Sequence, residues 1–123
     1  MELRPDIVLL GVEWRSRALL RAQLIEEGFE VVATDTWPAA RLHLRPGIKP
    51  KLVIVDLQRL PDPEQVLADL AVLMKPDRVL VLSAIGALPA DGIRRFGFHV
   101  VERPVPIDRI VEAVRNVTTS TSR

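Results

Sequence analysis

Five short apolar runs, separated by segments with helical spacing, constrain the fold of this chain more than any other feature. The runs cover residues 6–12, 30–33, 51–56, 78–83 and 98–102. Four of them are continuous and rich in Val, Ile and Leu, which is typical of strands buried on both faces of a parallel sheet. The second run is shorter and is followed by polar residues, which favours an edge strand.

The first inter-run segment has a helical pattern. Residues 15–27 carry Ala18, Ala22 and Ile25 at helical spacing, with two leucines beside them. Gly28 follows directly, and glycine commonly ends a helix because it adopts positive φ angles without steric cost. The pattern predicts a helix over residues 15–27.

The later segments are also helical in pattern. Asp62 precedes a proline and stands three positions before Gln65, a combination typical of a helix N-terminus with Asp62 as the N-cap. Residues 107–117 place five β-branched residues on one stripe, which predicts a core-facing helix. Residues 38–44 and 90–96 have weaker helical patterns.

Strands that alternate with helices predict right-handed βαβ units and a parallel sheet covered on both faces. The chain has 123 residues, of which 48% are hydrophobic and 27% charged, and this size and composition suit one globular domain. We expect a doubly wound α/β domain over residues 1–117. The polar residues 118–123 are expected to form a flexible C-terminal tail.

Composition excludes several classes of function. The chain has no cysteine, and its formal net charge of +1 gives no electrostatic reason to expect nucleic acid or an acidic membrane surface as partner. Its two histidines, His43 and His99, lack the spacing of a metal site. No apolar stretch reaches the length of a membrane span, and the N-terminus does not read as a signal peptide, so we expect a cytoplasmic protein.

Four polar side chains follow the predicted strands. Glu13 comes after the first strand, Asp56 ends the third, Ser83 ends the fourth and Arg103 follows the fifth. In an open parallel sheet, ligands bind beyond the carboxyl ends of the strands, where the strand order reverses. These side chains therefore predict an anion or phosphoryl pocket at that edge.

Four segments, in the right order, carry a resemblance to a known family. Residues 26–32, 49–57, 81–84 and 102–104 resemble the response-regulator receiver domain, the CheY-like phosphoacceptor module of two-component signalling. In this family the third strand ends in the phosphoacceptor aspartate, and that position corresponds to Asp56. The resemblance covers nearly the whole chain.

The resemblance implies a flavodoxin-like fold, with a five-stranded parallel sheet in the order 2-1-3-4-5 and helices on both faces. It implies that Asp56 occupies the phosphoacceptor position, with Ser83 beside it. It also implies a cis peptide bond before Pro104, because the family has a lysine–proline pair at this place, usually in the cis form.

Departures from the family pattern bear on function. The family holds Mg²⁺ with a pair of acidic residues after the first strand, and those positions are Gly11 and Val12 here. Neither offers a side-chain oxygen, and Glu13 comes one position late. Arg103 replaces the family lysine and changes a compact charge into a planar fork. We expect Asp56 and Arg103 to form an ion pair that closes the pocket.

These departures favour a degenerate receiver, or pseudo-receiver, that acts as a phosphorylation-independent protein-interaction module and is not an enzyme. No cofactor is expected. The alternative is a phosphorylatable receiver in which Asp56 accepts a phosphoryl group from a histidine kinase and Glu13 helps to bind Mg²⁺. A third hypothesis is a flavodoxin-like enzyme or small-ligand binder. It is disfavoured because no nucleophile–base pair is evident in the sequence.

The partner surface is predicted by family analogy. Receivers commonly dimerise or bind targets through the fourth helix, fifth strand and fifth helix, and the matching residues here are Arg94, Arg95, Phe96 and Arg109. A solvated face would look much the same. The expected partners are signalling proteins, with a histidine kinase and a second copy of the chain among the candidates. Trp14 is a further candidate to cover the pocket, although ordinary packing on the first helix is the favoured interpretation.

Overall fold

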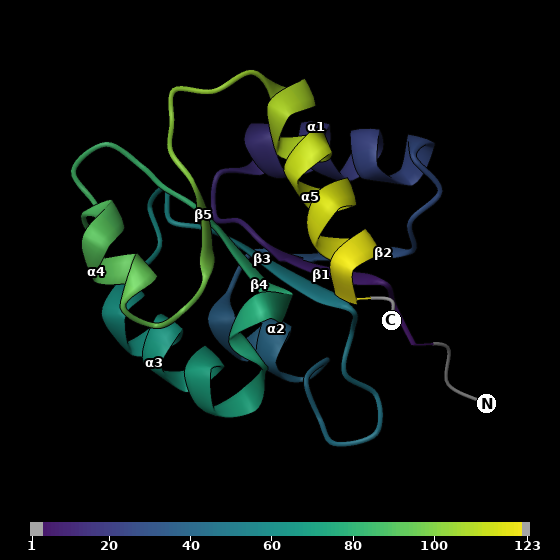
Figure 1. The fold of residues 1–123 in the computed structure, drawn as a ribbon, viewed down its shortest axis with the longest axis horizontal. Helices are drawn as coiled ribbons and strands as arrows, with labels where there is room; N and C mark the ends of the chain where they lie inside the picture. Colours follow the sequence, from purple (N-terminus) through teal and green to yellow (C-terminus); the bar gives the residue numbers. More distant parts are fainter. Residues whose placement is uncertain (1–3, 122–123) are drawn as a thin grey trace.

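The structure is a computed structural model that describes residues 4–121. These residues form a five-stranded sheet in the order β2-β1-β3-β4-β5, and neighbouring strands run parallel (Figure 1). The doubly wound α/β sheet is confirmed, as is the strand order that the receiver resemblance implies. β2 lies at an edge of the sheet, as its shorter apolar run predicts.

Each strand overlaps one of the five apolar runs, and the ends of the elements differ from the predictions by a few residues. The strands are β1 (Ile7–Leu10), β2 (Val31–Thr34), β3 (Leu52–Asp56), β4 (Val79–Leu82) and β5 (His99–Val101). The helices are α1 (Trp14–Glu26), α2 (Trp37–Arg41), α3 (Pro63–Leu73), α4 (Ala90–Arg94) and α5 (Ile107–Thr121), with a short 3₁₀ turn η1 (Pro76–Arg78) before β4.

The sheet separates two hydrophobic cores. Alternate residues of β1 point to opposite faces, so that Val8 packs with α2, α3 and α4 whereas Leu9 packs with α1 and α5. Figure 1 shows the same division, with α1 and α5 on one side of the sheet and the other three helices on the opposite side. β1, β3 and β4 are fully buried because helices cover both of their faces.

The residues of α1 that face the core are not the residues whose spacing predicted the helix. Ala18, Ala22 and Ile25 are exposed, and the buried residues of α1 are Leu20 and Leu24. Both sets have helical periodicity, so spacing alone could not identify the face that packs on the sheet.

Two other predictions need correction. Asp62 precedes α3 in a left-handed conformation, with φ of 48°, and its side chain makes no capping hydrogen bond. Residues 118–121 are helical and extend α5, whereas a flexible tail was predicted. The Thr118 side chain is buried and its hydroxyl donates to the carbonyl of Val114 at 2.8 Å, so this polar residue is accommodated within the helix. Residues 122–123 lie outside the described part of the chain.

Within residues 4–121, no helix combines the length and the apolar character that crossing a bilayer requires.

Truncation in the central strand should be costly. Ile54 in β3 is fully buried between the two helical layers. We expect Ile54→Ala to lower the free energy of unfolding by about 2–5 kcal/mol, because the lost burial adds to the cost of the cavity. Urea denaturation measures this change.

Val72→Ala is the matched control, because Val72 lies on α3 with 86% of its surface exposed. Its effect should stay within about 0.5 kcal/mol. Equal losses in the two variants would contradict the assignment of β3 to the centre of the core.

Candidate functional site

The predicted pocket lies at the carboxyl edge of the sheet. The strand order reverses between β1 and β3, since the chain leaves β1 toward β2 and then continues on the other side of β1. Asp56 is the last residue of β3, Ser83 follows β4, and Arg103 lies two residues after β5. The parallel strands therefore bring together three polar side chains that are far apart in sequence.

A bidentate ion pair joins Asp56 and Arg103 at this edge. Arg103 Nη1 donates to Asp56 Oδ1 at 2.5 Å, and Nη2 donates to Oδ2 at 2.9 Å. Asp56 is 3% exposed, and the Arg103 side chain is 21% exposed. The planar guanidinium matches the carboxylate with two parallel hydrogen bonds, which is the strongest geometry available to such a pair.

Further hydrogen bonds hold the pair in place. Asp56 Oδ1 also accepts from the backbone N–H of Gln58 at 2.9 Å. Ser83 Oγ accepts from the backbone N–H of Arg103 at 2.9 Å, and its carbonyl accepts from Arg103 Nη1 at 3.3 Å. Ser83 thus fixes the start of the β5–α5 loop, whose Arg103–Pro104 peptide bond is cis. Both carboxylate oxygens of Asp56 are engaged by donors from this chain.

The positions of the family's acidic pair are occupied by backbone and an apolar side chain. Gly11 is buried beside Asp56, and a Cβ at Gly11 would come within 3.8 Å of Asp56 Cβ. Val12 is half-buried and packs against the core formed by α2, α3 and α4. Neither residue contributes a side-chain oxygen to the pocket.

Arg17 is a site residue that sequence reasoning missed. Its Nη1 donates to the carbonyl of Gly11 at 2.7 Å and to that of Val12 at 3.4 Å. Arg17 precedes Leu20 by three residues and Leu24 by seven, so it lies on the sheet-facing side of α1. The sequence signal that could have identified Arg17 is a charged residue in the first turn of the helix, on the side that faces the sheet.

Glu13 is directed to its own helix. It is the N-cap of α1, and its Oε2 accepts from the backbone N–H of Ser16 at 2.9 Å. This bond satisfies one of the backbone donors that a helix start leaves without a partner. The Glu13 carboxylate, which the phosphorylatable hypothesis assigns to Mg²⁺, is therefore already engaged in capping α1.

These residues do not fit a Mg²⁺ site. Mg²⁺ requires near-octahedral oxygen coordination, usually with one or two carboxylates and several waters. Asp56 is the carboxylate at the pocket, and Arg103 holds both of its oxygens. Within residues 4–121 no group of three or more His, Cys, Asp or Glu side chains is arranged to hold a metal ion.

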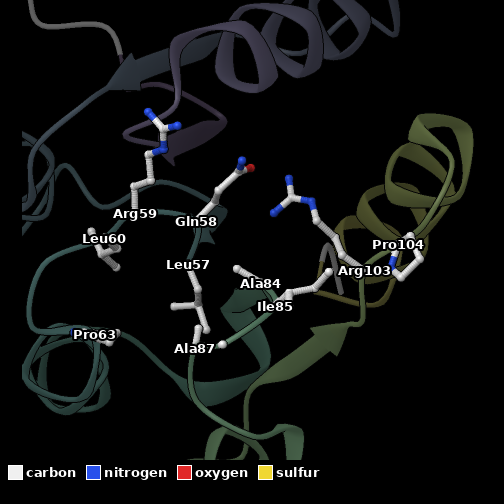
Figure 2. A pocket seen from close by; sticks show the side chains of 11 residues that line it. Leu57, Gln58, Arg59, Leu60, Pro63, Ala84, Ile85, Ala87, Arg103 and Pro104 are labelled. Atoms are coloured by element: carbon white, nitrogen blue, oxygen red, sulfur yellow. The ribbon is translucent and has the colours of Figure 1, made fainter.

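A cleft of about 610 Å³ lies next to the ion pair, between the β3–α3 and β4–α4 loops. Figure 2 shows the side chains of Gln58, Arg59 and Arg103 extending along one side, with Leu57 and Ile85 among the apolar residues on the other. Arg59 has a φ of 60°, a conformation that few non-glycine residues adopt. Because Arg59 and Arg103 both line it, the cleft is basic at its rim.

The remaining predicted residues lie away from Asp56. Arg94 and Arg95 are exposed at the end of α4, and Arg109 is exposed on α5. Phe96 is half-buried, packs against the core and stacks on Phe98 with ring centroids 5.4 Å apart.

Trp14 begins α1 and is 62% exposed. The Arg15 guanidinium carbon lies 5.7 Å from its ring centroid, so its local contact is a cation–π pair on the surface of α1.

Comparison by sequence gives no match to a protein-family model or to a curated protein. Comparison by structure gives close matches. The signal receiver domain of a Luxo repressor protein from Vibrio parahaemolyticus is 25% identical to this chain, with a TM-score of 0.77 over 97% of this chain and 93% of that one.

Two further matches cover nearly the whole of both chains. A response regulator receiver protein from Sinorhizobium medicae is 22% identical, with a TM-score of 0.76 over 97% of this chain and 98% of that chain. A CheY-like response regulator receiver domain protein from Methanospirillum hungatei is 16% identical, with a TM-score of 0.78 over 97% of each chain. With the strand order and the strand-end residues described above, these matches identify the chain as a domain with the CheY-like fold of response regulator receivers.

Proposed function

We propose that this chain is a pseudo-receiver, a phosphorylation-independent protein-interaction module in signal transduction, and that it is not an enzyme. The observation that carries the proposal is the bidentate pair between Asp56 and Arg103. An aspartate accepts a phosphoryl group through a carboxylate oxygen, and here each oxygen accepts a hydrogen bond from the same guanidinium. The pair occupies the place where an active receiver presents its nucleophile.

The charges around Asp56 support the same conclusion. Phosphoryl transfer relies on metal ions to neutralise the charge that develops on the transferred group. In this chain the positive charge at Asp56 comes from Arg103, and Arg17 binds the carbonyls of Gly11 and Val12. Fixed guanidinium groups thus replace an exchangeable cation. A domain built this way signals through its surface and its partners.

The phosphorylatable alternative requires Glu13 to help bind Mg²⁺. Against it stands the hydrogen bond from the Ser16 N–H to the Glu13 carboxylate, which a metal ligand at this position would give up. The third reading, a small-ligand binder or enzyme, has the cleft beside Arg103 in its favour. Arg59 and Gln58 line that cleft, but they form no nucleophile–base pair.

The proposed partners are signalling proteins, by analogy with the receivers among the structural relatives, and the proposed location is the cytoplasm. A histidine kinase is a candidate partner, but phosphoryl transfer would not be its role. The exposed side chains of Arg94, Arg95 and Arg109, at α4 and on α5, are the residues that we propose to contact a partner. Nucleic acid and membranes are not proposed as partners.

Incubation with acetyl phosphate and Mg²⁺, followed by intact-mass measurement, tests the proposal. We expect no phosphoryl adduct, because Arg103 holds both carboxylate oxygens of Asp56. One added phosphoryl group that disappears in Asp56→Ala would contradict the proposal and support the phosphorylatable receiver.

Restoring the family residues should restore the chemistry. The variant Gly11→Asp, Val12→Asp, Arg103→Lys should gain a Mg²⁺-dependent adduct on Asp56 under the same conditions. A Cβ can be added at Gly11, because it would lie 3.4 Å from Arg17 Cβ and 3.8 Å from Asp56 Cβ, both ordinary van der Waals contacts.

The matched control for this variant keeps Arg103 and changes only Gly11 and Val12. We expect the control to carry much less phosphate than the triple variant, since the ion pair persists. Equal phosphorylation of the two proteins would show that Arg103 is not what holds Asp56 inactive.

The ion pair should also contribute to stability. Arg103→Ala leaves the buried Asp56 carboxylate with one backbone donor, and we expect a loss of about 1–3 kcal/mol in the free energy of unfolding. The double variant Asp56→Ala, Arg103→Ala should recover part of that loss, because it leaves no buried charge without a partner. Chemical denaturation of the wild type, both single variants and the double variant gives the coupling free energy. A coupling of zero would mean that the two side chains do not interact in solution.

A further inference from the structure

Helix α1 carries large apolar side chains on its outer face as well as on its inner face. Leu20 and Leu24 are buried against the sheet, whereas Trp14, Leu19 and Ile25 are 62%, 54% and 43% exposed. A surface helix ordinarily presents polar residues to solvent. Three of the six large hydrophobic side chains that are exposed within residues 4–121 lie on this one helix. The outer face of α1 therefore has the character of a contact surface.

The charges of α1 are placed against its own dipole. Arg15 lies in the first turn and Glu26 in the last, although a helix favours acidic groups at its N-terminus and basic groups at its C-terminus. Neither side chain has an ion-pair partner among residues 4–121. This arrangement of charges destabilises the isolated helix slightly. Opposite charges supplied by another chain would offset that cost.

Four exposed residues form one stripe along the outside of α1. Arg15, Leu19, Ala22 and Glu26 follow one another at intervals of four, three and four residues, which places them on one face of a helix. We call these four residues the outer stripe. Trp14 lies beside it.

The outer stripe is complementary to itself in the antiparallel direction. A two-fold axis between positions 20 and 21 lies equally far from Arg15 and Glu26, and equally far from Leu19 and Ala22. Two copies related by this axis would place Arg15 of each opposite Glu26 of the other, and Leu19 of each opposite Ala22. An isologous contact requires this kind of self-complementarity.

We propose that two copies of this chain associate through α1, packed antiparallel along the outer stripe. Ala22 is small enough to let the helix axes approach to about 8–10 Å, with Leu19 of the other copy filling the space beside it. Measured along the helix axis, Trp14 and Ile25 of the second copy are about 3 Å apart in height. Two reciprocal Arg15–Glu26 pairs close the ends of the contact.

The size of the surface sets the strength of the association. A helix of thirteen residues is about 20 Å long, so its outer face is smaller than the roughly 800 Å² per partner of a standard stable interface. We therefore expect a weak, reversible dimer with a dissociation constant of about 10–500 µM. The association does not depend on the state of Asp56, so it can hold or fail independently of the proposed function.

Sedimentation velocity of the full chain, from roughly 10 µM to 1 mM and at low salt, measures the association. We expect the weight-average mass to rise from that of the monomer toward that of the dimer. A protein that stays monomeric over the whole range would overturn the proposal and leave the α1 face to a different partner.

Charge exchange tests the antiparallel register. Arg15→Glu or Glu26→Arg alone should weaken association by about tenfold or more, because each places like charges opposite one another twice. The double variant Arg15→Glu, Glu26→Arg should return to within about threefold of the wild type, since the exchanged pairs form again. A double variant as weak as the singles would overturn this register.

Two controls separate a lost contact from a lost fold. Arg15→Glu places an acid at the helix N-terminus, so the melting temperature of the dilute protein should not fall while association is lost. Arg95→Glu makes the same charge change just after α4 and should leave association unchanged. Loss of association in Arg95→Glu but not in Arg15→Glu would overturn the α1 contact and place the dimer at α4.

Discussion

The ion pair between Asp56 and Arg103 is the interaction on which the carboxyl edge of this domain depends. Its two hydrogen bonds join the end of β3 to the loop after β5, and Ser83 fixes that loop from the end of β4. A carboxylate that is 3% exposed cannot stay charged at low cost without such a partner. If the chain acts as the proposed pseudo-receiver, the bonds that satisfy Asp56 also keep it from acting as a nucleophile, so the stability of this edge and the loss of the receiver chemistry would have one cause.

In the proposed pseudo-receiver, fixed arginines lie where an active receiver binds a metal ion, and this would change how the domain is regulated. A bound metal ion and a phosphoryl group can dissociate, whereas Arg103 and Arg17 are part of the chain and would keep the pocket in one state. Regulation by association then becomes the natural alternative. The outer face of α1, with its exposed Trp14, Leu19 and Ile25, is where the exposed apolar side chains concentrate. An exchange between monomer and dimer would be set by concentration and by salt, since charge pairs at its ends are screened.

Much of the fold could be predicted from the sequence, because β1, β3 and β4 are buried on both faces and appear as continuous apolar runs. The face of α1 could not be predicted. Ala18, Ala22 and Ile25 have the same periodicity as Leu20 and Leu24, and only the contact with the sheet distinguishes the two sets. The structure of residues 118–121 was also missed, because composition does not reveal that Thr118 bonds back to its own helix.

The sequence by itself determined the alternation of strands and helices, and through the family resemblance it indicated the strand order and the position of Asp56 at a strand end. It also showed that Gly11 and Val12 offer no side-chain oxygen. Only the tertiary structure decided that Arg103 donates to both oxygens of Asp56 and that Arg17 donates to the carbonyls of the two residues after β1. It also decided that Glu13 caps α1. The reason is that periodicity and local propensity act over a few neighbouring residues, whereas these contacts depend on side-chain directions that are set when strands and helices distant in sequence pack together.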